Sequence, residues 1–174
     1  DSVLPSASPL PAGFSFVAQE ESEVSTRQLA RLASDNHEAN HFFNDPALEP
    51  DAARRLFEEW VRRCCHKLAR HVFVLTDPEG APAAFAIYLG ADKLKERLDL
   101  SLIILDFIVV DERHQGRGLG KALMLETLNW LADDYEWVEL RTSFNNYPAL
   151  ALYHRLGFET IASDLIFSRL LLSE

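Results

Sequence analysis

Residues 100–121 decide the fold of this chain, and they read LSLIILDFIVVDERHQGRGLGK. The first half is an apolar run with one acidic interruption, Asp106, and it predicts a buried strand. The second half is a turn followed by Gly116, Gly118 and Gly120, which predict an open helix start. A helix N-terminus presents unpaired backbone N–H groups and the positive end of the helix dipole. We therefore predict an anion site here, most naturally one for phosphate.

The glycine spacing differs from that of the two familiar nucleotide-binding loops. The chain has neither G-x-x-x-x-G-K-[ST] nor G-x-G-x-x-G at this place, and what remains is Gln115-x-x-Gly118-x-Gly120. This pattern, after a strand that ends Ile-Val-Val-Asp, resembles the pyrophosphate loop of the GNAT superfamily of acetyl-CoA-dependent N-acetyltransferases.

A second stretch strengthens the resemblance. Residues 146–158 read NYPALALYHRLGF, which is similar to the other signature of that family, N-x-x-A-L-x-L-Y-x-x-x-G-F. The two motifs stand in the expected order, separated by one helix and one strand. On these two motifs the chain is identified as a member of the GNAT superfamily.

The resemblance implies an α/β (α+β) fold, with a mixed, mostly antiparallel central sheet of about seven strands flanked by about four helices. Hydrophobic periodicity agrees with this order of elements. Strands are expected near residues 14–19, 72–75, 83–89, 100–110, 137–142 and 165–172. Helices are expected near residues 26–34, 51–68, 119–132 and 148–157, and residues 91–99 are expected to form a charged connection.

Length and composition bound the organisation of the chain. Residues 1–13, with three prolines among Ser and Ala, read as a flexible leader, and residues 14–174 read as a single domain. The net charge of −10 argues against a nucleic-acid partner and is compatible with a cationic substrate. No apolar run approaches the length of a membrane span. Cys64 and Cys65 are adjacent and poorly placed for a disulfide, so we expect a cytoplasmic protein.

One short motif points to a different chemistry. Residues 37–41 read HEANH, a literal H-E-x-x-H, which on a helix would turn two imidazoles to one face for zinc. Residues 44–46, Asn-Asp-Pro, break the helical pattern within a turn of this motif. We therefore expect no metal, and zinc hydrolysis is a remote alternative.

The stretch around residues 40–61 carries a looser resemblance, to GNAT enzymes that acetylate amino sugars on nucleotides, of the dTDP-fucosamine type. Those relatives carry Ser-Arg before the phenylalanine, where this chain has Asn40 and His41. On this resemblance His41, Phe42 and Trp60 are expected to bind the substrate. The alternative is that Phe42 and Trp60 are packing residues.

The family resemblance also assigns the acyl donor, acetyl-CoA. Backbone groups of Ile108, Val109 and Val110 would pair with the pantetheine arm as an added strand does, and one N–H would polarise the thioester carbonyl. The pyrophosphate would lie against Gln115, Gly116, Arg117, Gly118, Leu119, Gly120 and Lys121. For the side chains of Arg117 and Lys121 a solvated surface role is the alternative. Asn146 matches a residue that contacts the cofactor arm, and its alternative is a turn-forming role.

Amide formation from a thioester needs a proton acceptor for the amine and a proton donor for the leaving thiolate. Tyr153 matches the position from which relatives protonate the thiolate, and its alternative is a core tyrosine with a satisfied hydroxyl. Asp106 is the candidate base, because burying a carboxylate without a purpose is costly. A structural partner to a buried donor is the alternative for Asp106, and His41 is the second candidate base.

The sequence therefore predicts an N-acetyltransferase that moves an acetyl group from acetyl-CoA directly to a primary amine of a small molecule. An amino sugar is one candidate acceptor, and a protein N-terminus, a peptide or a polyamine are the others. A sensor that binds acyl-CoA without turnover is the alternative from another class. A homodimer is left open as the state of assembly.

Overall fold

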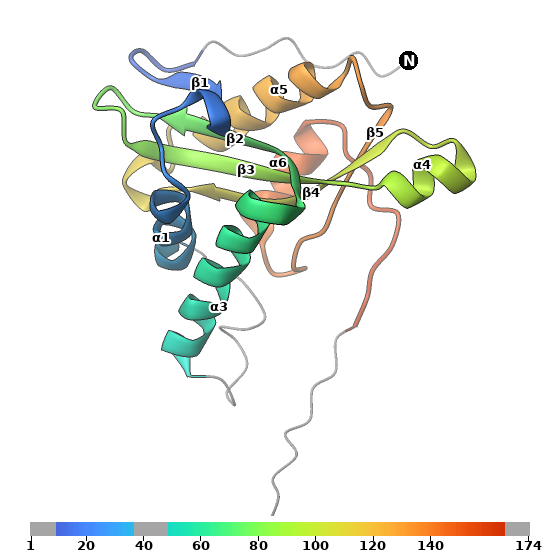
Figure 1. Ribbon diagram of the computed structural model, residues 1–174, viewed down its shortest axis with the longest axis horizontal. Coiled ribbons are helices and arrows are strands. Elements are labelled where there is room, and N and C mark those ends of the chain that lie inside the picture. The colour runs from blue at the N-terminus through green and yellow to red at the C-terminus, as the bar shows by residue number, and fades with distance from the viewer. Residues whose placement is uncertain (1–9, 37–48, 166–174) are drawn as a thin grey trace, which may run out of the picture.

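The computed structural model describes residues 10–36 and 49–165, and its core is one sheet (Figure 1). The described strands lie side by side in chain order, β1-β2-β3-β4-β5. They are β1 (Ser15–Ala18), β2 (Ala69–Thr76), β3 (Pro82–Gly90), β4 (Leu102–Val110) and β5 (Trp137–Leu140). The pairs from β1 to β4 are antiparallel, and β4 pairs with β5 in parallel. The prediction of a mixed, mostly antiparallel sheet with flanking helices is confirmed.

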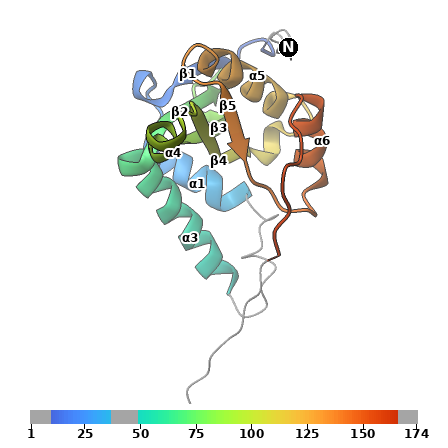
Figure 2. The same ribbon diagram turned by 90° about the vertical axis from the view of Figure 1, so that its right-hand side faces the viewer.

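Helices cover both faces of this sheet (Figure 2). On one face lie α1 (Thr26–Asn36) and α3 (Pro50–Arg63), and on the other α5 (Leu119–Leu131) and α6 (Tyr147–Arg155). A fifth described helix, α4 (Asp92–Leu98), joins β3 to β4. Short turns are η1 (Gln19–Glu21), the π-helical η2 (Cys64–Leu68) and η3 (Glu112–His114).

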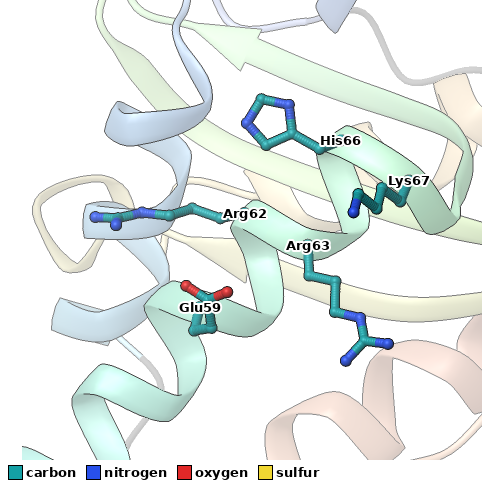
Figure 3. Close-up of a pocket in the computed structure, with 5 residues that line it drawn as sticks. All are labelled: Glu59, Arg62, Arg63, His66 and Lys67. Carbon is teal, nitrogen blue, oxygen red and sulfur yellow. The ribbon is translucent and has the colours of Figure 1, made fainter.

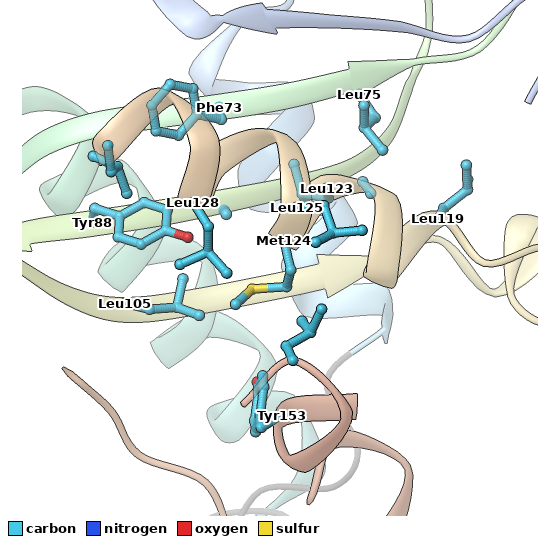
Figure 4. Packing of buried hydrophobic residues seen from close by; sticks show 14 of the residues in the cluster. Phe73, Leu75, Tyr88, Leu105, Leu119, Leu123, Met124, Leu125, Leu128 and Tyr153 are labelled. Carbon is cyan, nitrogen blue, oxygen red and sulfur yellow. The ribbon is translucent and has the colours of Figure 1, made fainter. Parts of the chain in front are cut away.

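Each face of the sheet has its own apolar cluster. The α5 and α6 face is the larger, because α5 is apolar on nearly every side and so buries most of its length (Figure 4). Its members from α5 are Leu119, Leu123, Met124, Leu125, Leu128 and Leu131, and α6 adds Tyr153. The α1 and α3 face buries one stripe from each helix, such as Leu29 and Val61.

Strand β4 contains an irregularity that its apolar pattern did not predict. Phe107 lies opposite Ile87, whereas Leu105 lies opposite Tyr88, so Asp106 is an extra residue in the strand. Such a β-bulge re-aims the side chains that follow it. Leu105 accordingly packs in the cluster under α5, and Phe107 packs in the cluster under α1 and α3.

The structure departs from the sequence prediction at two places. The described residues form five strands, fewer than the seven or so predicted, and the expected terminal strand at 165–172 lies outside the described residues from 166 onward. The expected charged connection at 91–99 is largely helix α4. Asp92 stands in the first turn of α4, and Lys95 and Arg97 stand in its last turn. These charges complement the helix dipole, so the charge pattern that suggested a loop supports a helix.

The N-terminal side of the described chain also contacts the core. Leu10, which falls within the predicted leader, packs against the cluster under α5. The boundary of a single domain at residue 14 stays a prediction. Across residues 10–36 and 49–165, no helix combines the length and the apolar character that crossing a membrane requires.

Candidate functional site

The candidate site is built on the half of β4 that has a paired strand on one side only, within the described residues. β5 pairs with β4 from Leu102 to Leu105 and ends at Leu140, whereas β4 continues to Val110. Residues 106–110 therefore have β3 on one side and, within the described residues, no paired strand on the other. An unpaired strand edge offers N–H and C=O groups to any extended ligand.

The hydrogen-bond pattern shows which backbone groups face this open edge. Residue pairs in an antiparallel ladder alternate between hydrogen-bonded and non-hydrogen-bonded. The N–H of Asp111 donates to the carbonyl of Ala83 at 2.8 Å, so the next pair along, formed by Val110, turns away from β3. The same alternation turns Val109 toward β3 and Ile108 toward the open edge. Of the three predicted residues, Ile108 and Val110 thus present their backbone groups outward.

A loop with two left-handed glycines continues from the end of this edge. Gly116 and Gly118 have φ of 74° and 80°, and Gly118 is the N-cap residue of α5. A Cβ at either position would meet no atom within 4 Å, so the glycines serve the backbone conformation and leave the loop surface open. Arg117 and Lys121 are exposed and make no ion pair with the described residues. The loop therefore combines free N–H groups with two free cations.

Close packing ties the loop to its surroundings. A Cβ at Gly120 would lie 3.5 Å from Cγ2 of Val110 and 3.7 Å from Cδ2 of Leu152, so α5, β4 and α6 meet at this residue. Leu119 is buried, and the Gln115 side chain donates to the carbonyl of Val110 at 3.2 Å. The observed role of Gln115 is thus to anchor the loop on β4.

The residues before the loop hold it against the sheet. Asp111 is buried and accepts hydrogen bonds from the backbone and guanidinium of Arg113, and these bonds lower the pKa of its carboxyl. His114 stands 3.7 Å from the Asp77 carboxylate in the turn between β2 and β3, and its ring lies edge-on to Phe14. Residues 111–114, which precede the loop, are therefore held in place against the sheet.

The second sequence motif forms α6 and the turn that ends it. Asn146 caps the helix: its side-chain oxygen accepts from the N–H of Ala149 at 3.4 Å, and its amide donates to Thr142 at 3.3 Å. At the other end Gly157 has φ of 87°, and its N–H donates to the carbonyl of His154. The cap accounts for Asn146 in the structure, and its predicted contact with the cofactor stays a prediction.

Tyr153 is fixed by this C-terminal turn. The N–H of Phe158 donates to the carbonyl of Tyr153 at 3.0 Å, which with the Gly157 bond completes a Schellman motif. The two rings lie 5.9 Å apart, as the hydrophobic contact of that motif requires. The family pattern Tyr-x-x-x-Gly-Phe is therefore also a helix-ending device that sets the position of the tyrosine.

The Tyr153 side chain lies in the cluster between α5 and α6 (Figure 4). Burial raises the pKa of its hydroxyl to about 12. Its hydroxyl has no hydrogen-bond partner within the described residues, unlike Tyr88, whose hydroxyl pairs with Thr127 at 2.7 Å. Tyr153 thus keeps its proton at neutral pH and has a donor to offer, although it is a weaker acid than an exposed tyrosine.

Asp106 faces the other side of the sheet, toward α3. Its Oδ2 accepts a hydrogen bond from Nε1 of Trp60 at 2.7 Å and lies 3.8 Å from Sγ of Cys64. Burial, followed by the charge of Asp106, raises the pKa of the Cys64 thiol to about 12, so this thiol stays protonated. The structure thereby brings together Asp106 and Trp60, for which the sequence predicted different roles, and adds Cys64, for which it predicted no role in the site.

Several of the remaining predictions concern residues 37–48, which the structure does not describe. His41, Phe42 and the H-E-x-x-H motif are outside the described residues, so their roles stay predictions. Within the described ranges, no group of three His, Cys, Asp or Glu side chains converges to hold a metal ion.

A surface hollow at the end of α3 is separate from the candidate site (Figure 3). It is lined by exposed polar and charged side chains, namely Glu59, Arg62, Arg63, His66 and Lys67. Arg62 pairs with Glu58 at 3.2 Å, and cations in the last turn of a helix complement its dipole. The helix end therefore accounts for these charges.

Comparison with known families matches this architecture to one of them. The model of the acetyltransferase (GNAT) family matches residues 31–158. The chain belongs to the GNAT family. Members of this family use acetyl-CoA as the acyl donor. The family predicted from the two sequence motifs is confirmed.

Individual relatives in the GNAT family match over part of their length. The spermine/spermidine N(1)-acetyltransferase of Bacillus subtilis is 35% identical over 83 residues, 47% of this chain and 55% of that protein. The spore coat polysaccharide biosynthesis protein SpsD of the same organism is 26% identical over 134 residues, 76% of this chain and 43% of that protein. This chain thus spans about half of the length of these curated relatives.

Solved GNAT structures share the fold at low identity. The ribosomal-protein-S18-alanine N-acetyltransferase from Escherichia coli superposes with a TM-score of 0.62 at 22% identity. The match covers 86% of this chain and 79% of that one.

Proposed function

We propose that this chain is an N-acetyltransferase that moves an acetyl group from acetyl-CoA directly to a primary amine of a small molecule. The observation that carries the proposal is the open half of β4, with a carboxylate on one face, a phenol on the other and an anion-binding loop at its end. Amide formation from a thioester requires a proton acceptor, a proton donor and a binding site for the acyl carrier, and these three features supply them.

The donor would lie along the open edge. Backbone groups of Ile108 and Val110 suit the amides of a pantetheine arm, in the manner of strand addition. The loop from Gln115 to Lys121 suits the pyrophosphate, because free N–H groups at a helix N-terminus bind anions. Arg117 and Lys121 add positive charge at the margin of this loop.

The reaction would proceed by direct attack of the amine on the thioester carbonyl. Asp106 takes a proton from the amine nitrogen while the C–N bond forms, and an outward N–H of Ile108 or Val110 stabilises the oxyanion. The C–S bond then breaks, and the Tyr153 hydroxyl donates its proton to the leaving thiolate. Water returns this proton to Tyr153, and Asp106 releases the amine proton to solvent.

The charge of the chain favours a cationic acceptor. The net charge of −10 and the Asp106 carboxylate at the site both attract a protonated amine, which loses its ammonium proton to solvent before the neutral amine attacks the thioester. An amino sugar fits this description, and so does a polyamine of the kind named for the Bacillus subtilis relative. A protein N-terminus is the remaining alternative, and the name of the Escherichia coli structure gives a protein, ribosomal protein S18, as its acceptor.

A reducing compartment suits the two thiols, since Cys64 and Cys65 are adjacent and free. We therefore propose a cytoplasmic enzyme. A homodimer stays a prediction.

The test is release of the CoA thiol from acetyl-CoA with a panel of amino sugars, polyamines and peptides. Asp106→Asn should lower kcat by about 10²–10⁴-fold, the range for loss of a general base. Asp133→Asn is the matched control, since Asp133 is an exposed carboxylate just beyond the C-terminal end of α5, whereas the loop lies at its N-terminal end, and this change should alter kcat little. Tight acetyl-CoA binding without thiol release for any amine would favour the sensor instead.

A further inference from the structure

Trp60 on α3 and Cys64, the first residue after that helix, stand one turn apart and meet the same oxygen of one carboxylate. Trp60 Nε1 donates to Asp106 Oδ2 at 2.7 Å, and Cys64 Sγ lies 3.8 Å from that atom. The other oxygen, Oδ1, has no hydrogen bond within the described residues. Trp60 and Cys64 therefore hold Oδ2, and Oδ1 is left to accept a proton.

We infer that Trp60 is a positioning residue, which fixes the Asp106 carboxylate so that Oδ1 alone receives the proton of the acceptor amine. The inference rests on the proposed function for the role of Asp106. It adds a residue from a different element, 46 positions away in sequence, that acts only through that carboxylate.

The position of Asp106 explains why it needs such a support. As the extra residue of a β-bulge, Asp106 lacks the cross-strand neighbour that an ordinary strand residue has. A short carboxylate in that setting can rotate about its side-chain bonds. A hydrogen bond from a helix on the adjacent face removes this freedom, and hydrogen bonds to an ionised group are the strong ones.

The chemistry of tryptophan suits this task. An indole N–H only donates, so Trp60 can hold the carboxylate without competing for the amine proton. Packing does not account for the residue, because Trp60 is 38% exposed and is absent from both apolar clusters. The N–H of Trp60 joins this side chain to β4 through its hydrogen bond to Asp106.

The change from α-helix to π-helical turn at the end of α3 also supports a positioning role for Trp60. The regular α-helix ends at Arg63, and Cys64 opens the π-helical turn η2. The N–H of Cys64 bonds back to the carbonyls of Trp60 and Val61. Short π-helical turns recur at functional sites, where they re-aim side chains. Here the change of winding begins at Cys64, one turn after Trp60.

A double-mutant cycle tests the inference. Trp60→Phe keeps an aromatic ring and deletes the donor, and kcat should fall by about tenfold with KM for acetyl-CoA unchanged, as expected for a lost hydrogen bond to a charged group. In the Asp106→Asn background the same substitution should change kcat by less than about twofold, since the group it positions is gone. Trp137→Phe is the control, because Trp137 is 60% exposed and lies on β5.

A spectroscopic measurement tests the contact without relying on turnover. The indole N–H resonance of Trp60, assigned with Trp60→Phe, should shift in Asp106→Asn and stay in place in Asp133→Asn. If the chemical shift of this indole N–H is the same in Asp106→Asn as in the unaltered protein, the inference is overturned.

The experiments distinguish a failure of this inference from a failure of the proposed function. Equal loss of kcat from Trp60→Phe in both backgrounds, or no loss in either, would overturn the inference while leaving the proposed function intact. An unaltered protein that releases no thiol with any amine would overturn the proposed function, and the indole resonance would still decide the contact.

Discussion

The two halves of β4 have the same apolar character and different surroundings. Residues 102–105 lie between β3 and β5, whereas residues 106–110 lie beside β3 alone within the described chain. The boundary between the halves is Asp106, where the bulge falls. Both halves bury side chains in the core, Phe107 and Val109 among them, but only the second half also has an open backbone edge and the Asp106 carboxylate. If this division holds, substitutions around the first half should change stability, and those around the second should change chemistry.

The largest effect is expected across the open half. Tyr153→Phe keeps the ring that packs on Phe158 and removes only the hydroxyl, so kcat should fall by about 10²–10⁴-fold while acetyl-CoA affinity changes little. Tyr147→Phe is a matched control on the same helix, since Tyr147 is 68% exposed. If kcat stays within a few-fold of the unaltered value, Tyr153 is only a core residue, and the proposed difference between the two halves of β4 is wrong.

The next effect tests the paired half. Leu105 is 4% exposed in the cluster under α5, so Leu105→Ala should lower the free energy of unfolding by about 2–4 kcal/mol through lost burial and a cavity. Below the unfolding transition kcat should stay within about threefold of the unaltered value. Urea titration measures the first and thiol release the second. Leu98→Ala is the control, because Leu98 is 67% exposed. A large loss of kcat with little loss of stability would contradict the assignment of this half to the core.

A smaller effect is expected at the boundary, from the thiol beside Asp106. Burial and the Asp106 charge raise the pKa of Cys64 from an ordinary value of 9.0 to about 12. Below pH 9 the thiol is protonated in both states, so it adds no pH dependence. Between pH 9 and 12 the unfolded chain loses this proton and the folded chain keeps it, so stability falls as pH rises, by at most about 1.4 kcal/mol per pH unit. Unfolding measured at pH 8 to 10.5 should show a shallower fall in Cys64→Ala, and an identical slope would contradict the assigned environment.

The smallest effect concerns the loop at the end of the open half. Asp and Asn would meet the same backbone strain at Gly118, where φ is 80°, and a Cβ there would meet no atom within 4 Å. Gly118→Asp should therefore bind acetyl-CoA about fivefold more weakly than Gly118→Asn, because only the former places a negative charge against the pyrophosphate at the helix start. Calorimetry on the two variants isolates the charge, and equal affinities would place the pyrophosphate elsewhere.

The sequence predicted the parts of the site that local patterns encode. The glycine loop and the Tyr153 turn each depend on residues close in the chain, with left-handed glycines at 116, 118 and 157, and both appear where the motifs predicted. The bulge at Asp106 depends on the register of β4 against β3, and a run that is apolar on both sides of Asp106 carries no signal for register. The contact between Trp60 and Asp106 depends on how α3 docks on the sheet, so the sequence could name both residues without joining them.

The order of the strands also bears on how the site is assembled during folding. β2, β3 and β4 are successive antiparallel neighbours, so their pairing closes short loops and can form early. The parallel pairing of β5 must wait for the crossover through α5, and α6 with Tyr153 follows still later in the chain. We therefore expect a growing polypeptide to complete the surface for the donor and the base before it gains the acid, so that catalysis begins only when the last elements have docked.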